Sequence, residues 1–331
     1  MQACDQAVRQ PAGAACRGVL ACAMVAVLFL HDVPAAAQDA VTQTTQPGAL
    51  PAPAADDPGK ASPSQQAAAK SDARRTRPQP IWEAGLGATV LALPDYRGSD
   101  KTRGYLLPLP YFVYRGPYVS LDRGGLKAEL LDQGRLEMDF SVNLSVPVRS
   151  DGNSARAGMP NLRPALEIGP QLIADLWNSS DGRAKLQLQL PVRYAFALST
   201  DTRDAGFIFH PRLGLDMRDF AGYGGLNAGL VFGALFATSR QHEYFYTVDP
   251  QYATPTRPAY QAGGGYSGLQ LTMSLSKRFP NYWFGAFVRA DWLKGAVFAD
   301  SPLVRRDTTV AAGIAISWIF AESAGRVARR D

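Results

Sequence analysis

Hydrophobic and polar residues alternate without interruption in two long stretches of this chain. In residues 135–146 the apolar side chains fall at every second position, from Leu136 to Val146, and charged or polar side chains occupy the positions between them. Residues 185–198 repeat the pattern, with lysine, glutamine, proline, arginine and alanine between the apolar positions. Successive side chains of a strand point to opposite faces, so both stretches predict strands with one apolar and one polar face.

These two strands are long for a water-soluble sheet, whose strands average about five or six residues. A tilted strand that crosses an outer membrane needs about 9–11 residues. A closed barrel with lipid outside and a polar lumen inside explains both the length and the alternation, because every backbone hydrogen bond is then made between strands. The sequence therefore predicts an all-β fold, an antiparallel transmembrane β-barrel.

About twelve strands are predicted between Ile81 and Phe320. Outer-membrane barrels join their strands by short periplasmic turns and long extracellular loops, and short and long connections alternate along this part of the chain. The alternation of short and long connections requires residues 118–131 to form two short strands. The alternative is a barrel of ten strands, in which this segment does not cross the membrane. The expected strands are 81–92, 105–114, 118–122, 126–131, 135–148, 164–177, 185–199, 207–218, 223–238, 267–279, 282–293 and 308–320.

The residues outside the predicted barrel divide into three segments. Residues 1–37 have the features of a secretory signal peptide, with an apolar run at 18–30 and an A-x-A cleavage site at the end. Residues 38–80 are rich in alanine, proline, glutamine and serine, and they predict a disordered periplasmic linker. Residues 321–331 predict a polar periplasmic tail, which leaves residues 81–320 for the barrel.

Charge and cysteine content narrow the possible functions. The chain has a net charge of +5, and its basic residues are scattered instead of forming a stripe on one element. No nucleic-acid partner is therefore expected. All three cysteines, Cys4, Cys16 and Cys22, lie in the predicted signal peptide, so the mature chain is expected to have no disulfide and no thiolate chemistry.

The sequence offers little for catalysis. The expected mature chain keeps two histidines, His210 and His242. His210 falls on the polar face of its strand, so we expect it to join a network of lumenal charges. His242 and Glu243 lie at the start of the long loop 239–266, but no Gly-x-Ser-x-Gly elbow or matching triad accompanies them. We expect no catalytic residue, no metal site and no cofactor.

Three short stretches resemble the outer-membrane family of MltA-interacting protein (MipA) and OmpV. They are Leu-Pro-Asp-Tyr-Arg-Gly-Ser at 93–99, Leu-Pro-Leu-Pro-Tyr at 107–111, and residues 296–304, which precede a last strand ending near Trp318. Their order and spacing also match, and the resemblance covers about residues 81–320. No individual role is assigned to the residues that carry it. They are Pro94, Asp95, Tyr96, Gly98, Ser99, Pro108, Pro110, Asp300, Ser301, Pro302 and Trp318.

The resemblance implies a location in the outer membrane of a Gram-negative bacterium. It also implies a non-enzymatic scaffold, because the namesake of the family joins a murein-degrading lytic transglycosylase to a murein-synthesising penicillin-binding protein. The other expected partners are outer-membrane lipid and lipopolysaccharide around the barrel, and the barrel assembly machinery. That machinery reads an apolar final strand that ends in an aromatic residue, which here is Phe320.

Two further functions stay open on the sequence alone. A narrow channel for small solutes would be lined by the polar side chains of the alternating strands. A surface adhesin would act through the expected extracellular loops 149–163 and 239–266. The expected lumenal side chains are Glu137, Asp139, Asn143, Lys185, Gln187, Gln189 and Arg193.

Overall fold

Antiparallel strands make up most of the described chain. The computed structural model describes residues 79–115, 119–122, 125–128, 131–132, 135–198 and 203–327. The predicted signal peptide and the predicted linker up to residue 78 lie outside these residues. The wall strands are β2 (Trp82–Pro94), β3 (Thr102–Arg115), β4 (Val119–Asp122), β5 (Gly125–Ala128), β6 (Leu131–Asp132), β7 (Leu136–Leu144), β8 (Ala165–Asn178), β9 (Ala184–Ala197), β10 (Arg203–Phe209), β11 (Arg212–Met217), β12 (Leu226–Ala237), β13 (Gly265–Arg278), β14 (Tyr282–Trp292) and β15 (Thr308–Glu322).

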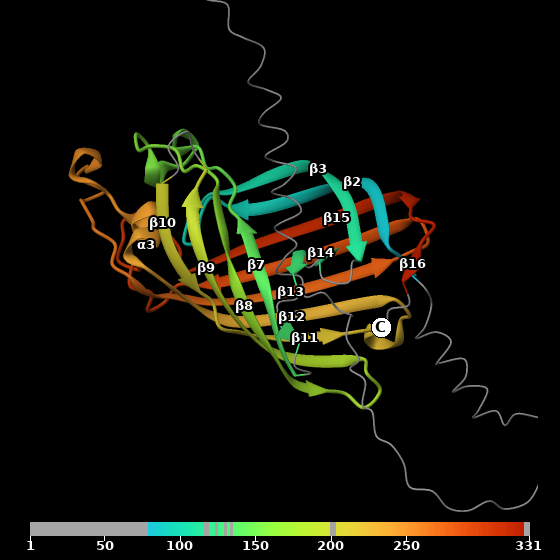
Figure 1. Ribbon diagram of the computed structural model, residues 1–331. Helices are drawn as coiled ribbons and strands as arrows, with labels where there is room; N and C mark the ends of the chain where they lie inside the picture. The colour runs from blue at the N-terminus through green and yellow to red at the C-terminus, as the bar shows by residue number, and fades with distance from the viewer. Residues whose placement is uncertain are drawn as a thin grey trace, which may run out of the picture.

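These strands form one sheet that curves into a barrel (Figure 1). Their order in the sheet is β5-β4-β3-β2-β15-β14-β13-β12-β10-β9-β8-β7-β6, and β11 pairs with β12 and β9. The pairs are antiparallel throughout, and β5 lies against β7, so the two ends of the sheet approach each other. The antiparallel all-β barrel predicted from the alternation is therefore confirmed.

The number of membrane-crossing strands depends on the segment between β3 and β7. The strands expected at 118–122 and 126–131 appear as β4 and β5, which have four residues each. The described part of each strand extends about 13 Å, compared with the roughly 30 Å of a hydrocarbon core. Within the described residues, ten strands are long enough to cross, if β10 and β11 are counted as one. They are β2, β3, β7, β8, β9, β10 with β11, β12, β13, β14 and β15.

Proline explains where two strands depart from the expected limits. The single strand expected at 207–218 is interrupted at Pro211, between β10 and β11. Proline has no backbone N–H to donate to the ladder. The Pro211 carbonyl still accepts a hydrogen bond from the Ala234 amide at 3.1 Å. Likewise β7 ends at Leu144, shortly before Pro147, although the alternation predicted a strand to residue 148.

The two ends of the described chain meet beside the barrel rim. β15 continues to Glu322, and β1 (Gln79–Pro80) pairs with β16 (Arg326–Val327). The Ile81 amide also donates to the Gly325 carbonyl at 3.1 Å. The segments predicted as linker and tail are thus joined where they leave the wall. This end of the barrel is called the terminal end below.

The opposite end, called the loop end, carries the long connections. Loops 95–101, 145–164, 238–264 and 293–307 lie there, and by the usual orientation of such barrels they face outward from the cell.

No helix among the described residues is long and apolar enough to cross a membrane. The helices are α3 (Ser239–Tyr246) and the single turns η2 (Ser150–Gly152), η3 (Ser154–Arg156), η4 (Phe220–Gly222) and η5 (Pro250–Tyr252).

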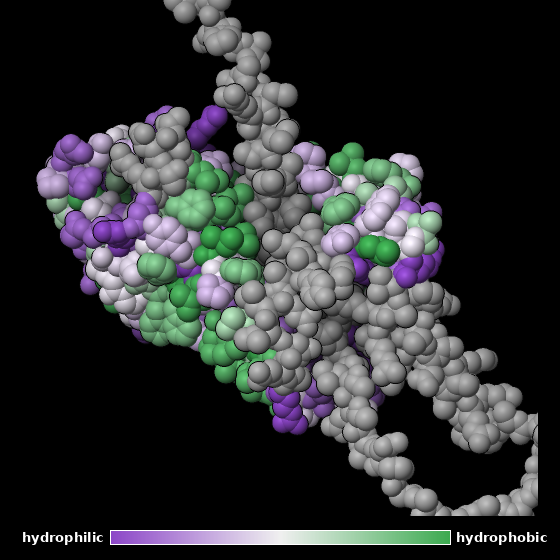
Figure 2. Space-filling model, viewed as in Figure 1, coloured by the Kyte–Doolittle hydropathy of each residue, from purple (hydrophilic) through white to green (hydrophobic). Residues whose placement is uncertain are grey.

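Large apolar side chains cover the outer face of the wall. Leu106 on β3 is 73% exposed, and Ile314 and Trp318 on β15 are 55% and 53% exposed. Figure 2 shows hydrophobic side chains gathered over the middle of the wall and hydrophilic ones at the loop end. Exposing so much apolar surface to water is unfavourable, whereas lipid covers it at no such cost. The outer face is therefore built to contact a bilayer.

Candidate functional site

The inner face of the barrel has an apolar half, formed by β2, β3, β14 and β15. Its close packing depends on glycine: a Cβ at Gly313 would lie 2.5 Å from Phe287 and 2.6 Å from Leu91. The Tyr111 and Trp283 rings lie 6.4 Å apart, centroid to centroid. Side chains thus fill this side of the lumen. The apolar half consists of Leu91, Leu93, Leu109, Tyr111, Val113, Trp283, Phe287, Ala311, Ala315 and Ile319, all of them buried.

The facing inner surface is a polar half, formed by β7, β8, β9 and β11. Arg193 Nε lies 3.1 Å from Glu167 Oε2, and the Asn143 amide donates to the same oxygen at 3.0 Å. Arg212 Nε donates to Gln189 Oε1 at 2.8 Å. Such buried groups need partners, and neighbouring strands supply them. The residues predicted to be lumenal, from Glu137 to Arg193, lie on this inner face, and so do His210 and Asp216.

Packed loops form a cap at the loop end. The turn at 95–101 interlocks with loop 293–307: Tyr96 Oη donates to the Leu303 carbonyl at 2.8 Å, and the Arg305 amide donates to the Gly98 carbonyl at 2.7 Å. Gly98 has a φ of +90°, which other residues rarely adopt. The buried apolar residues of the cap are Tyr96, Val148, Ala155, Leu162, Tyr246, Val248, Ala262, Leu293, Ala296, Phe298 and Leu303.

Two polar residues of the first family stretch connect the cap to a third loop. Asp95 accepts hydrogen bonds from Arg103 Nε at 2.5 Å and from the Asn153 amide at 2.9 Å. The same Asn153 amide lies 3.1 Å from Ser99 Oγ. Asn153 sits between η2 and η3 and is 1% exposed, so this contact holds loop 145–164 against the turn.

Aromatic rings hold the fourth loop, which contains α3. The Tyr246 and Phe298 rings stack at 3.7 Å, and Ser301 Oγ donates to the Tyr246 carbonyl at 2.7 Å. His242 is buried between the Gly263 carbonyl, 2.6 Å from Nδ1, and Ser267 Oγ, 2.6 Å from Nε2. Burial lowers the pKa of His242 and raises the pKa of Tyr246. Burial also raises the pKa of Tyr96 to about 12.

The structure thus brings most of the family-stretch residues together and leaves the others apart. Asp95, Tyr96, Gly98, Ser99 and Ser301 belong to the cap, with Pro94 at the end of β2 and Pro302 and the exposed Asp300 on loop 293–307. Pro108, Pro110 and Trp318 instead lie on the outer face, in β3 and β15. Sequence reasoning did not single out Asn153 or Tyr246 as partners of these stretches, because no local pattern marks contacts between distant loops.

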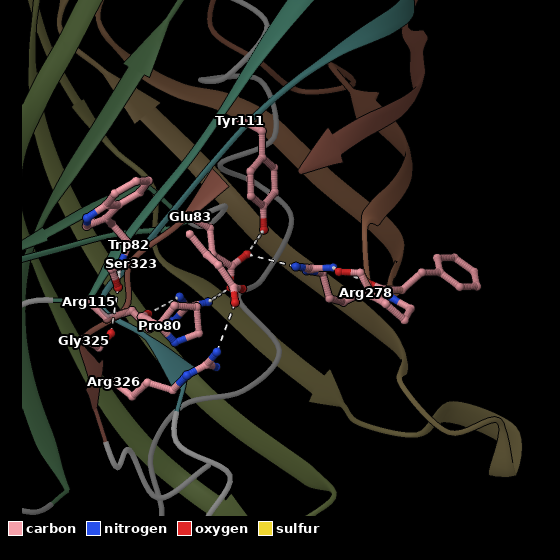
Figure 3. Close-up of polar contacts among 12 residues, drawn as sticks. Pro80, Trp82, Glu83, Tyr111, Arg115, Arg278, Ser323, Gly325 and Arg326 are labelled. Carbon is pink, nitrogen blue, oxygen red and sulfur yellow. Dashed lines mark hydrogen bonds and ion pairs between the residues drawn. The ribbon is translucent and has the colours of Figure 1, made fainter. Parts of the chain in front are cut away.

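A polar cluster centred on Glu83 lies at the terminal end (Figure 3). Its carboxylate accepts hydrogen bonds from Tyr111 Oη at 3.1 Å, from Arg115 Nη2 at 3.1 Å and from Arg278 Nη2 at 3.3 Å. Arg115 Nη1 also donates to the Pro80 carbonyl at 2.9 Å. The cluster therefore ties β1 to the wall and connects β2 and β3 to β13.

None of these arrangements forms a recognisable reaction centre. His242 contacts a carbonyl and a serine that follow it in the chain, while Glu243 accepts a hydrogen bond from the Gln261 amide at 2.9 Å. Within the described ranges, no group of three or more His, Cys, Asp or Glu side chains is placed to hold a metal ion.

An apolar outer face, an antiparallel wall whose two ends approach each other, and long loops at one end define an outer-membrane β-barrel. Residues 86–320 match the family model described as "MltA-interacting protein MipA". The chain therefore belongs to that family, as its three short stretches indicated, and its location is the outer membrane of a Gram-negative bacterium. No curated protein matches the chain.

Three solved proteins are similar to this chain at low sequence identity. A bacterial polysaccharide outer membrane secretin is 10% identical, with a TM-score of 0.36, and the match covers 73% of this chain and 99% of that one. The CymD monoaromatic hydrocarbon channel is 11% identical, with a TM-score of 0.32 over 74% and 90% of the two chains. OprG from Pseudomonas aeruginosa is 9% identical, with a TM-score of 0.20 over 74% and 95%. Similarities of this size say nothing about what this chain binds or transports.

Proposed function

We propose that this barrel is a non-enzymatic scaffold that docks murein-remodelling enzymes at its periplasmic end. The partner class comes from the family, whose name describes a protein that interacts with MltA. A lytic transglycosylase and a penicillin-binding protein are the proposed partners. Lipid and lipopolysaccharide would surround the apolar outer face, and the barrel assembly machinery would receive β15 during insertion.

The observation that best supports docking is the construction of the terminal end. β1 and β16 pair there, and Arg115 binds both the Pro80 carbonyl and Glu83. The predicted linker at 38–80 is thus attached to a firmly held point on the periplasmic rim. A linker fixed at one end can hold a bound enzyme close to the membrane, since tethering raises the effective concentration of its partner.

The filled lumen favours a scaffold over a channel. The apolar half packs its side chains against one another, and the polar half pairs its charges across neighbouring strands. The cap covers the loop end with four interlocked loops. A solute pore would need continuous space through all three regions.

Crosslinking in cells, followed by mass spectrometry of the captured neighbours, tests the scaffold. The full chain should capture lytic transglycosylases or penicillin-binding proteins. A matched variant, in which residues 40–75 are replaced by a Gly/Ser sequence of equal length, should lose that capture while the barrel still inserts. Capture of only assembly factors and other barrels by the full chain would contradict the proposal.

A further inference from the structure

Strand β3 has an open edge along most of its length. On one side β2 pairs with it from Thr102 to Tyr114, but on the other side β4 pairs only with Tyr114 and Arg115. Among the described residues, no strand lies against the remaining edge, from Thr102 to Val113. Open sheet edges occur in the hydrocarbon region of a membrane only where protein covers them or water reaches them. The edge therefore needs a cover that the described part of the chain does not supply.

Two prolines mark this edge as a feature of the sequence. The Arg115 amide donates to the Ile81 carbonyl beside β2 at 2.7 Å, so the odd-numbered residues of β3 turn their backbone groups toward β2. The even-numbered residues turn theirs toward the open side, and these include Pro108 and Pro110. Proline has no N–H to donate and is confined to the edges of sheets. An added strand could not form a continuous ladder here, so a partner would contact this edge mainly through side chains.

The outer surface of β3 carries a protruding side chain next to an empty position. Leu106 is 73% exposed, more than any other large apolar side chain among the described residues. At Gly104, no heavy atom beyond the chain neighbours lies within 4 Å of the place that a Cβ would take. The two residues lie two positions apart in a strand, so they share the outer face. None of the outward-facing residues between Thr102 and Tyr114 is charged.

We propose that this barrel forms a twofold dimer through β3, in which Leu106 packs over Gly104 of the partner subunit and the reverse. A twofold contact needs a surface that is complementary to itself, and a protrusion beside an empty position provides one. Small residues let two backbones approach closely at contacts inside a membrane. Because the surface is uncharged, two identical copies do not repel each other there. The dimer would take the open edges of both copies out of the lipid, and this goes beyond the proposed scaffold function.

Single-cysteine crosslinking in isolated outer membranes tests the dimer independently of the scaffold. The native cysteines all lie in the predicted signal peptide, so the unsubstituted chain gives the background. Leu106→Cys should yield a crosslinked dimer with a short bifunctional thiol reagent. Val288→Cys is the matched control and should stay monomeric, because Val288 is 50% exposed on β14 and lies in register with Gly104 through β15 and β2. Equal crosslinking of the two variants, or none at Leu106→Cys, would overturn the proposal.

Filling the empty position should separate the two copies without harming the barrel. Gly104→Leu meets open space and a backbone outside the left-handed region, so the stability of the barrel should not fall. Self-association, followed by energy transfer between labelled copies in lipid vesicles, should weaken about tenfold. Gly224→Leu, at an equally open position in a turn at the terminal end, is the control and should leave the dimer intact. A monomeric wild-type barrel would mean that water covers the edge, and a dimer unaffected by Gly104→Leu would also refute this interface.

Discussion

The two halves of the lumen are stabilised in different ways. The apolar half excludes water by packing, with Phe287 and Leu91 closing over Gly313. The polar half fills a similar space with paired charges, such as Arg193 and Glu167 at 3.1 Å. Packed apolar groups are each stabilising, whereas a buried ion pair is close to neutral and becomes costly only when one partner is removed. Substitutions should therefore affect the two halves differently.

Truncation in the apolar half should have the largest effect. Phe287→Ala should destabilise the barrel by about 3–5 kcal/mol, because it removes a buried ring and leaves a cavity. Urea unfolding of the barrel in lipid vesicles measures the change. Phe284→Ala is the control on the outer face, where lipid fills the vacated space, and should cost much less. Equal losses in the two variants would mean that the apolar half is not a packed core.

Removing one charge from the polar half should cost nearly as much, but the loss should be recoverable. Glu167→Leu should destabilise by about 3 kcal/mol, because Arg193 is left buried without its carboxylate. The double variant Glu167→Leu with Arg193→Met should regain most of that stability. The same unfolding measurement decides the outcome. A double variant as unstable as the single one would show that the pair does more than balance charge.

A substitution in the cap should affect the loops without unfolding the wall. Asn153→Ala removes the donor to both Asp95 and Ser99, which should cost about 1–3 kcal/mol locally. Hydrogen exchange should then quicken in loop 145–164 and in the turn at 95–101, while the strands stay protected. Asn178→Ala, at the exposed end of β8, is the control and should leave exchange in the cap unchanged. Faster exchange throughout the wall would contradict a separately packed cap.

Acidification should have the smallest effect, and it should be confined to the α3 loop. Because burial lowers the pKa of His242, the folded loop binds fewer protons than the unfolded loop just below the ordinary pKa of 6.5. The stability of the loop is therefore complete above pH 6.5 and falls as the pH decreases below it. Proteolysis of loop 238–264 should increase between about pH 7 and about pH 5. His242→Gln should abolish this pH dependence, and a pH dependence that persists in the variant would assign it to another group.

The difference between the apolar and the polar half of the lumen also explains how much of the wall could be predicted from the sequence. The two stretches with unbroken alternation became β7 and β9, which both belong to the polar half. There a polar inner face contrasts with an apolar outer face. In β3 the inner Leu109 and Tyr111 are as apolar as the outer Leu106 and Phe112, so period-two contrast nearly disappears.

The cap was only partly predictable. The family stretches indicated that residues near 95–99 and 300–302 matter, and the structure places most of them in one packed cluster. Asn153 and Tyr246 complete that cluster from other loops. Their contacts depend on how the barrel brings the loops together, and no spacing in the chain encodes that. The ion pair between Arg97 and Asp291 was missed for the same reason, since the two residues lie 194 positions apart in the chain.

The central claim is that a filled and capped lumen makes this barrel a docking protein and not a pore. Single-channel recording of the full mature chain in a planar bilayer tests it most directly. Both halves of the lumen and the cap are packed, so the account predicts insertion, verified by protease protection, without stable conductance steps. Reproducible, ion-selective open steps from the inserted wild-type barrel would contradict it.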